Sequence, residues 1–136
     1  MVAAGNAQRP ADNDEAVWTM EFLKVKPGKF WATMGYLDDN WMRVRQEAKR
    51  QGAVLDYRRI AEADGAEGNQ TIVLLTEYKN QVAYEGREKL FAFILKKLPA
   101  KVLFFPPDDL YEILPTRLFD DFTDDQSVHL KLLAKE

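Results

Sequence analysis

The chain has no cysteine, one histidine (His129) and one serine (Ser127) among its 136 residues. The lack of cysteine excludes disulfides, thiolate nucleophiles and cysteine-ligated zinc or iron–sulfur centres. A lone histidine cannot build a histidine-rich metal site, and Ser127 and His129 have no evident third group to complete a nucleophilic system. We therefore read both as surface residues and expect no metal site and no cofactor.

The chain also lacks a basic segment and a long apolar run. Its formal net charge is -3, and no stretch concentrates lysine and arginine, which argues against a nucleic-acid partner. No apolar run approaches the roughly 20 residues that span a bilayer, so we expect no membrane partner. Runs of aspartate, such as 120–125, lack the loop spacing of a calcium site and are interpreted as solvated surface.

What is present is an ordinary globular composition, 46% hydrophobic and 30% charged. Residues 1–16 have little apolar surface and no period, so we expect a disordered arm. Residues 17–115 should form one domain, and 116–136 a C-terminal extension. The arm lacks the apolar stretch of a signal peptide, and the compartment stays open between the cytoplasm by default and an exported mature form.

Periodicity predicts a strand over 17–25, a Lys26-Pro27-Gly28 turn, a helix over 29–50 and a strand over 53–62. It then predicts a strand over 70–78, a helix over 81–98 capped by Asn80, and a last strand over 110–114. Four consecutive apolar residues at 72–75 indicate a strand buried on both faces, which places 70–78 centrally and pairs it with 53–62. The order β-α-β-β-α-β is that of a ferredoxin-like α+β domain, with a four-stranded antiparallel sheet and two helices on one face.

The first helix carries one apolar stripe, with Trp31 and Met42 widening the buried face. The stripe consists of Phe30, Met34, Leu37, Trp41, Val44 and Ala48. Arg45 is assigned to the solvated side with the other charged residues. In the second helix the predicted stripe consists of Tyr84, Phe91, Leu95 and Leu98, extended by Leu90 and Ile94, with Phe93 toward the outside.

Both faces of the strands at 17–25 and 70–78 are apolar, yet the two helices can cover only one face of the sheet. An uncovered apolar patch of that size normally marks an interface. We therefore expect a homodimer that packs sheet against sheet. The alternative is that the C-terminal segment folds over the open face of its own subunit.

The turn from Val25 to Phe30, the long aromatic helix after it, and the strand pair with the apolar 72–75 run together resemble the dimeric α+β barrel superfamily. This superfamily includes antibiotic-biosynthesis-monooxygenase-like, EthD-like and NIPSNAP-like proteins. The resemblance covers roughly residues 17–115 and implies the fold and the dimer. It carries no catalytic motif that could be matched to this sequence, and the histidine-ligated haem of some relatives would require an axial imidazole.

Polar groups on otherwise apolar elements are the candidate site residues. Glu21, Tyr57 and Arg59 are the catalytic candidates. Trp31, Trp41 and Tyr78 are the candidate ligand-binding residues, in a cleft between helices and sheet. A purely structural alternative pairs Glu21 with Arg59, or Glu77 with Arg58, across neighbouring strands.

Two functions follow from these residues. The first is an uncharacterised dimeric barrel that binds a small apolar or aromatic molecule between helices and sheet. The second is a cofactor-independent monooxygenase or isomerase acting on a ring-bearing substrate, with Glu21 or Tyr57 handling a proton and Arg59 steadying an oxyanion. A stand-alone DNA-binding regulator is disfavoured by the acidic charge.

Overall fold

The computed structural model describes residues 15–63, 70–98 and 107–121. Its strands are β2 (Val17–Val25), β3 (Val54–Ala61), β4 (Thr71–Tyr78), β5 (Tyr111–Ile113) and β6 (Arg117–Phe119). Its helices are α1 (Phe30–Leu37), the π-helix η1 (Asp38–Met42), α2 (Arg43–Arg50), α3 (Gln81–Glu85), α4 (Arg87–Lys97) and α5 (Pro107–Leu110). Most of the predicted N-terminal arm, together with Ser127 and His129, lies outside the described residues.

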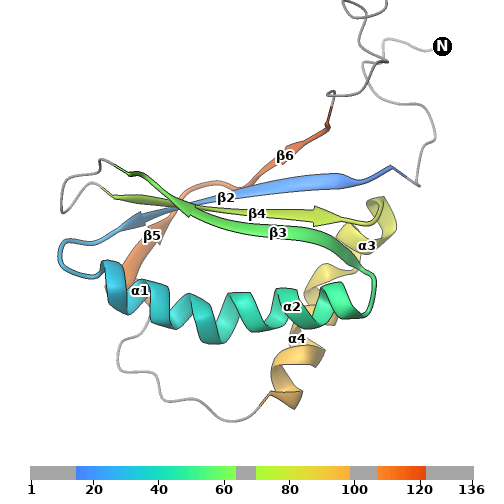
Figure 1. Ribbon diagram of the computed structural model, residues 1–136, viewed down its shortest axis with the longest axis horizontal. Coiled ribbons are helices and arrows are strands. Elements are labelled where there is room, and N and C mark those ends of the chain that lie inside the picture. The colour runs from blue at the N-terminus through green and yellow to red at the C-terminus, as the bar shows by residue number, and fades with distance from the viewer. Residues whose placement is uncertain (1–14, 64–69, 99–106, 122–136) are drawn as a thin grey trace, which may run out of the picture.

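The strands form one antiparallel sheet in the order β3-β4-β2-β5, with β6 also paired to β2 (Figure 1). The ferredoxin-like order is therefore confirmed, and the sheet has a fifth strand, β6, beyond the four predicted. As expected from the 72–75 run, β4 lies between β3 and β2. In the described part of the chain, no helix is long and apolar enough to cross a membrane.

Residues 111–119 run along the edge of β2 and contain one extra residue. Leu23 pairs with Ile113 and Met20 with Arg117, so three steps along β2 match four steps along the edge. The irregularity lies at Leu114–Thr116, where the Leu114 N–H donates to the Phe22 carbonyl at 2.9 Å and Pro115 has no N–H to pair. The last strand was predicted over 110–114, but Leu110 belongs to α5.

The first helix is continuous along the sheet but is not a regular α-helix throughout, which corrects the prediction for 29–50. Its middle, η1, has π geometry, and the Arg43 N–H bonds to the carbonyl of Asp38, five residues back. The Asn40 side chain donates to the Tyr36 carbonyl at 3.0 Å. This bond satisfies a backbone acceptor beside the π turn, where the regular helical ladder is interrupted.

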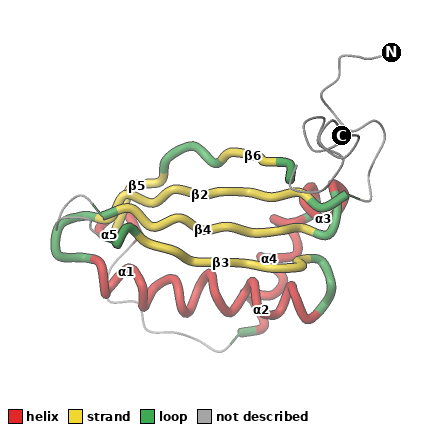
Figure 2. Tube along the Cα trace, turned by 45° about the horizontal axis from the view of Figure 1, so that its top comes forward, coloured by secondary structure: helices red, strands yellow, loops and turns green. Residues whose placement is uncertain are grey.

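The second helix is broken at Gly86 into α3 and α4 (Figure 2). Asn80 caps α3 as predicted, accepting from the Ala83 N–H at 2.8 Å. Within the predicted stripe of α4, Ile94 is buried as expected, whereas Leu95 is exposed and its assignment to the buried face is wrong. Phe93 lies outside, as expected.

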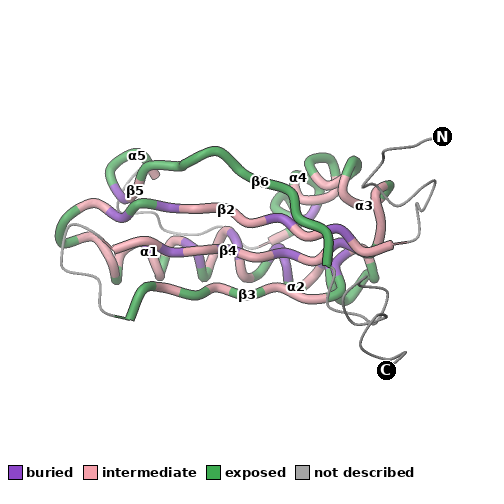
Figure 3. Tube along the Cα trace, turned by 90° about the horizontal axis from the view of Figure 1, so that it is seen from above, coloured by how far each residue is buried: buried purple, intermediate pink, exposed green. Residues whose placement is uncertain are grey.

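The helices lie on one side of the sheet, and the core lies between the two layers (Figure 1). Along β2 and β4, residues facing the helices are buried, except the half-buried Glu21, and those facing away are half-buried, except the exposed Lys24 (Figure 3). We call the side away from the helices the outer face. Its large apolar side chains on β2 and β4 are Trp18, Met20, Phe22, Val73 and Leu75. Both expectations for the sheet are confirmed: the helices cover one face, and the other face is apolar.

Candidate functional site

A carboxylate, Glu21, lies on the helix-facing side of β2. Its neighbours along that side of the strand, Thr19 and Leu23, are almost fully buried, so Glu21 is a charged group in the middle of the core layer. The Glu21 side chain itself remains 27% exposed. A buried or half-buried charge needs an opposite charge or hydrogen-bond donors close by.

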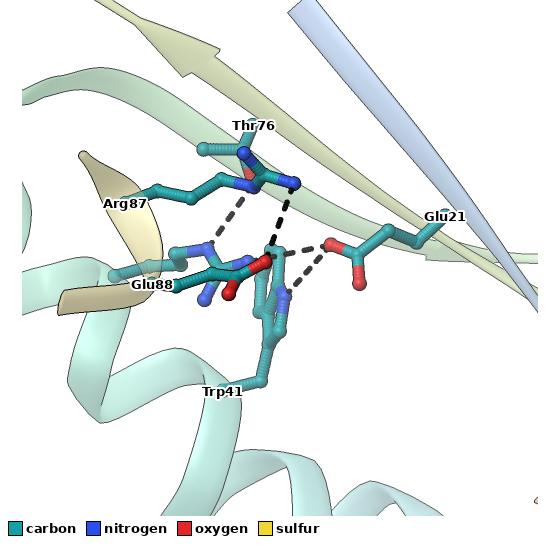
Figure 4. A network of polar contacts seen from close by, with 6 residues as sticks. Glu21, Trp41, Thr76, Arg87 and Glu88 are labelled. Atoms are coloured by element: carbon teal, nitrogen blue, oxygen red, sulfur yellow. Dashed lines mark hydrogen bonds and ion pairs between the residues drawn. The ribbon is translucent and has the colours of Figure 1, made fainter. Parts of the chain in front are cut away.

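These partners come from the long helix. The indole Nε1 of Trp41 donates to Oε2 of Glu21 at 3.4 Å, and Nη2 of Arg45 lies 3.3 Å from the same oxygen. Nε of Arg45 donates to the Thr76 hydroxyl at 3.2 Å. Figure 4 shows Glu21, Trp41 and Thr76 converging on one small region beneath the sheet. We call Glu21, Trp41, Arg45 and Thr76 the Glu21 cluster.

Arg45 is the most enclosed member of the cluster, with a side chain only 8% exposed. Its guanidinium carbon lies 4.8 Å from the ring centre of Trp41 and 4.1 Å from that of Phe91, in the range of cation–π contacts. Burial lowers the pKa of Arg45, while Tyr78 and Glu21 act to raise it. An arginine stays protonated at any physiological pH, so the cluster contains a permanent buried cation.

Four tyrosines surround the cluster. The Tyr57 ring packs edge-on against Trp41, with 5.9 Å between ring centres, and Tyr78 is fully buried beside Arg45. Tyr36 of α1 and Tyr111 of β5 form a further pair, with ring centres 6.2 Å apart. Burial raises the pKa of Tyr36 and of Tyr78, and it raises the pKa of Tyr111 to about 12, with the charges of Tyr36 and Glu21 acting in the same direction. All three phenols are therefore protonated at neutral pH.

The structure brings four of the six sequence candidates together: Glu21, Tyr57, Trp41 and Tyr78. Arg59 is elsewhere, because its Nη1 donates to Asp38 at 2.8 Å and to the Met34 carbonyl at 3.1 Å.

Trp31 is not part of the cluster either, and its assignment to the buried face is wrong. It is 79% exposed on the outside of α1, beside a shallow pocket of about 310 Å³ that Gly28, Phe30 and Gln70 also line. The ring of Trp31 packs edge-on against Phe30 there, with 5.0 Å between ring centres.

The two predicted cross-strand pairs are not formed. Glu21 could pair across strands with Arg59 only if β2 and β3 were neighbours, but β4 lies between them. Glu21 pairs instead with Arg45, and Arg58 lies 3.1 Å from Asp56 in its own strand. Glu77 sits on the outer face, where burial and the charges of Asp56 and Asp121 raise its pKa.

Sequence reasoning missed Arg45, Tyr36 and Tyr111. Arg45 was assigned to the solvated side of the helix, although it is four residues after Trp41 and next to Val44. Residues at that spacing share a helix face, so the apolar stripe itself carried the signal. Tyr36 and Tyr111 gave no comparable signal, because the strand containing Tyr111 is only three residues long.

No family model matches the sequence, and the search of curated proteins gave no match. Several solved structures are similar. A Bacillus cereus protein described as a candidate antibiotic-biosynthesis monooxygenase matches 81% of this chain and 94% of its own, at 10% identity and a TM-score of 0.53. SnoaB, a cofactor-independent oxygenase from Streptomyces nogalater, matches 81% of this chain and 96% of its own, at 12% identity and a TM-score of 0.51.

A NIPSNAP-like domain protein from Burkholderia xenovorans matches 81% of this chain and 88% of its own, at 9% identity and a TM-score of 0.50. At these identities the likeness shows the fold alone. It confirms the predicted ferredoxin-like α+β fold, which this chain shares with these proteins. Activity, ligand and assembly have to be argued from this chain's own residues.

The burial of the Arg45–Glu21 pair predicts unequal costs for removing its two members. Glu21→Gln leaves an enclosed guanidinium without its counter-charge and should lower the free energy of unfolding by about 3–5 kcal/mol. Arg45→Met leaves a carboxylate that water partly reaches, so it should lower the free energy of unfolding by clearly less than Glu21→Gln does. Urea unfolding followed by circular dichroism measures both. The control is Arg43→Met, which breaks the exposed Arg43–Asp39 pair and should change stability by less than about 1 kcal/mol. Equal costs for Glu21→Gln and Arg45→Met would contradict the asymmetry.

Proposed function

We propose that the chain is a homodimer that binds a small apolar or aromatic ligand between its helices and its sheet. The Glu21 cluster carries this proposal, because it places a few oriented polar groups among the aromatic rings of Trp41, Tyr57 and Tyr111. Small-molecule sites typically combine mostly apolar walls with a small number of fixed polar groups. The partial exposure of the Glu21 side chain shows that this part of the core layer is reached from outside.

The ligand would enter the site from the margin of the sheet formed by β5 and β6, on the far side of β2 from β4. Ile113 and Leu118 lie opposite Leu23 and Thr19 in register, and hence on the helix-facing side, yet they are 67% and 52% exposed. Leu23, one strand further in, is only 2% exposed. The described helices therefore cover the sheet up to β2 and leave Ile113 and Leu118, on the apolar margin beneath β5 and β6, exposed on the side of β2 that carries Glu21. A ligand would enter there.

Ligand binding can be followed by tryptophan fluorescence, since Trp41 contacts Glu21 directly. Titration with small aromatic compounds should give saturable quenching that persists in Trp31→Phe, which lacks the exposed indole on the outside of α1. Quenching that disappears in Trp31→Phe would place the ligand at the outer pocket and contradict the proposed site.

The apolar outer face of the sheet is the basis for proposing a homodimer. Trp18, Met20, Phe22, Val73 and Leu75 project there, and Phe119 of β6 extends the patch beside Trp18. The same face on a second copy is apolar in the same places, so two copies can cover each other about a two-fold axis. The charged residues of this face that are in described strands lie toward its rim: Asp56 and Arg58 on β3, Glu77 near the end of β4, Lys24 near the end of β2, and Glu112 and Arg117 on the edge strands β5 and β6.

Light scattering on the purified protein should give a mass near twice 15.7 kDa. Phe22→Glu places a charge in the centre of the outer face and should reduce the mass to that of one chain, because burying an unpaired carboxylate is strongly unfavourable. Phe93→Glu is the matched control, since Phe93 is an exposed phenylalanine on α4, away from the sheet. A wild-type mass of a single chain would rule the dimer out.

The second candidate function is a cofactor-independent oxygenase or isomerase, and the pairing of a carboxylate with a buried cation favours it. Glu21 would accept a proton from a ring-bearing substrate, with Tyr57 as the other candidate for proton transfer, and the positive charge of Arg45 would stabilise the resulting anion. Arg45 takes the role first given to Arg59, which is bound to Asp38. In an oxygenase the substrate's electrons would reduce dioxygen, with one oxygen atom retained in the product and the other released as water. SnoaB, which has a similar fold, is described as a cofactor-independent oxygenase.

Oxygen uptake with a panel of hydroxyaromatic compounds tests this second function. In buffer containing a chelator and no added cofactor, wild-type protein should consume oxygen. Loss of a general base typically lowers the rate by a factor of about 10²–10⁴. The rate of oxygen uptake by Glu21→Gln should therefore be at least about a hundredfold lower than that of wild type. Tyr57→Phe tests the other candidate for proton transfer, and Arg59→Lys should keep the wild-type rate. Equal turnover in wild type and Glu21→Gln would remove Glu21 from the mechanism.

A further inference from the structure

The outer pocket beside Trp31 plays no part in the proposed function. Its volume is about 310 Å³, and its lining consists of Gly28, Phe30, Trp31 and Gln70. Gln70 directly precedes β4, and its carbonyl accepts a hydrogen bond from the Val25 N–H, at the end of β2, at 2.9 Å. Because a strand rises about 3.3 Å per residue, Val25 lies roughly 13 Å along β2 from Glu21. The outer pocket is therefore a separate place from the Glu21 cluster.

The Trp31 ring forms one wall of this pocket and is held in place from below. An exposed aromatic side chain alone is ordinary on a protein surface. Trp31, however, packs at right angles against Phe30, and Phe30 in turn packs against the core cluster that contains Leu37 and Trp41. Since Trp31 is still 79% exposed, this contact leaves a face of the indole open to water. The pocket thus presents an anchored, flat apolar surface to a ligand.

Uncharged polar groups complete the lining. Gln70 has a side-chain amide, which can both donate and accept hydrogen bonds. Gly28 has a φ of 72°, a conformation that glycine adopts readily, and it has no side chain to cover its own peptide groups. Among the described residues, none forms a hydrogen bond with the Trp31 indole N–H, the Gln70 amide or the backbone N–H and C=O of Gly28. These groups are available to a ligand.

The surroundings of the pocket restrict the chemistry of that ligand. Lys26 and Lys29 flank Gly28 in the turn and place positive charge beside the pocket, which disfavours a cation. A purely apolar ring on Trp31 would displace water from the polar groups of the lining without replacing its hydrogen bonds, and this lowers affinity. A ligand with one apolar face and hydroxyl groups around its rim satisfies both parts of the lining. The pyranose ring of a sugar has this form, with C–H groups on its face and hydroxyls at its edge.

We propose that the outer pocket binds the pyranose ring of a sugar, with one face of the ring on the Trp31 indole and its hydroxyls bonded to the Gln70 amide and the Gly28 backbone. Ligand pockets commonly measure about 300–1,000 Å³, so a pocket at the small end of this range suits a single ring. This site goes beyond the proposed function, because it shares no lining residue with the Glu21 cluster.

The indole N–H signals of Trp18, Trp31 and Trp41 in the NMR spectrum tell the two sites apart, and Trp31→Phe identifies the Trp31 signal. Methyl β-D-glucopyranoside should shift the Trp31 signal with a Kd on the order of 1–10 mM and leave the Trp41 signal in place. Sorbitol has the hydroxyls without the ring, and benzyl alcohol has a ring with one hydroxyl. Each should bind at the Trp31 signal at least about tenfold more weakly.

Free glucose, tested beside the methyl glucoside, distinguishes two sources of the same ring. Tighter binding of glucose assigns the pocket to a free sugar. Equal or tighter binding of the glucoside, whose first carbon is blocked, assigns it to the end of a glycan chain. Either result supports a pyranose site.

Substitutions in the lining test the two halves of the contact. Trp31→Ala removes the flat surface and should abolish binding of the glucoside, measured by saturation transfer to the sugar signals. Gln70→Leu keeps the size of the side chain, removes the amide and should weaken binding about fivefold. Phe93→Ala, which removes an exposed aromatic ring from α4, is the matched control and should change nothing. Circular dichroism checks that all three variants are folded, as expected for exposed or half-buried positions.

The remaining outcomes would overturn the proposal. Equal responses to the glucoside, sorbitol and benzyl alcohol would remove the sugar as ligand, and wild-type binding in Trp31→Ala would remove the pocket. A glucoside that shifts Trp41 and not Trp31 would place the sugar at the Glu21 cluster. A Trp31 signal that moves with protein concentration, and not with sugar, would show that a second copy of the chain covers the pocket. None of these results bears on the aromatic ligand proposed for the Glu21 cluster, which the Trp41 signal reports independently.

Discussion

The buried ion pair between Arg45 and Glu21 joins the two layers of this fold. It connects the second half of the long helix to β2, the strand that pairs with β4, β5 and β6. The guanidinium has little access to water, so its charge is compatible with the folded state only while Glu21 and Thr76 stay in place. The position of the helix on the sheet and the geometry of the candidate site are therefore fixed by the same contacts.

The fold could be predicted because its signals are local and repeated. Alternation along 17–25, the apolar run at 72–75 and the Asn80 cap each specify an element within a few residues. The interruptions at η1 and Gly86 could not be predicted in the same way, because a π turn leaves the apolar stripe nearly intact. They depend on tertiary contacts, such as the one between Asp38 and Arg59.

The site was only half predictable. Glu21, Tyr57, Trp41 and Tyr78 stood out as polar or aromatic groups on apolar elements, and they do converge. Arg59 was misplaced because the pairing with Glu21 requires β2 and β3 to be neighbours, whereas the central position of 70–78, predicted and confirmed, puts β4 between them. Arg45 was overlooked because a charge on a helix is usually solvated. In this chain two aromatic rings and a carboxylate make its burial tolerable.

The irregular outer strands determine how such a sheet can associate. On one side β3 has a register shift between Val54 and Asp56, and on the other the edge strand carries its extra residue around Pro115. Neither border offers a straight, unbroken row of backbone donors and acceptors to another molecule, which is how natural sheets avoid adding strands without limit. Strand addition at a border can repeat without limit and continue into fibrils. The same irregularities that disturb the ladder thus make both borders of this sheet poor templates for an added strand.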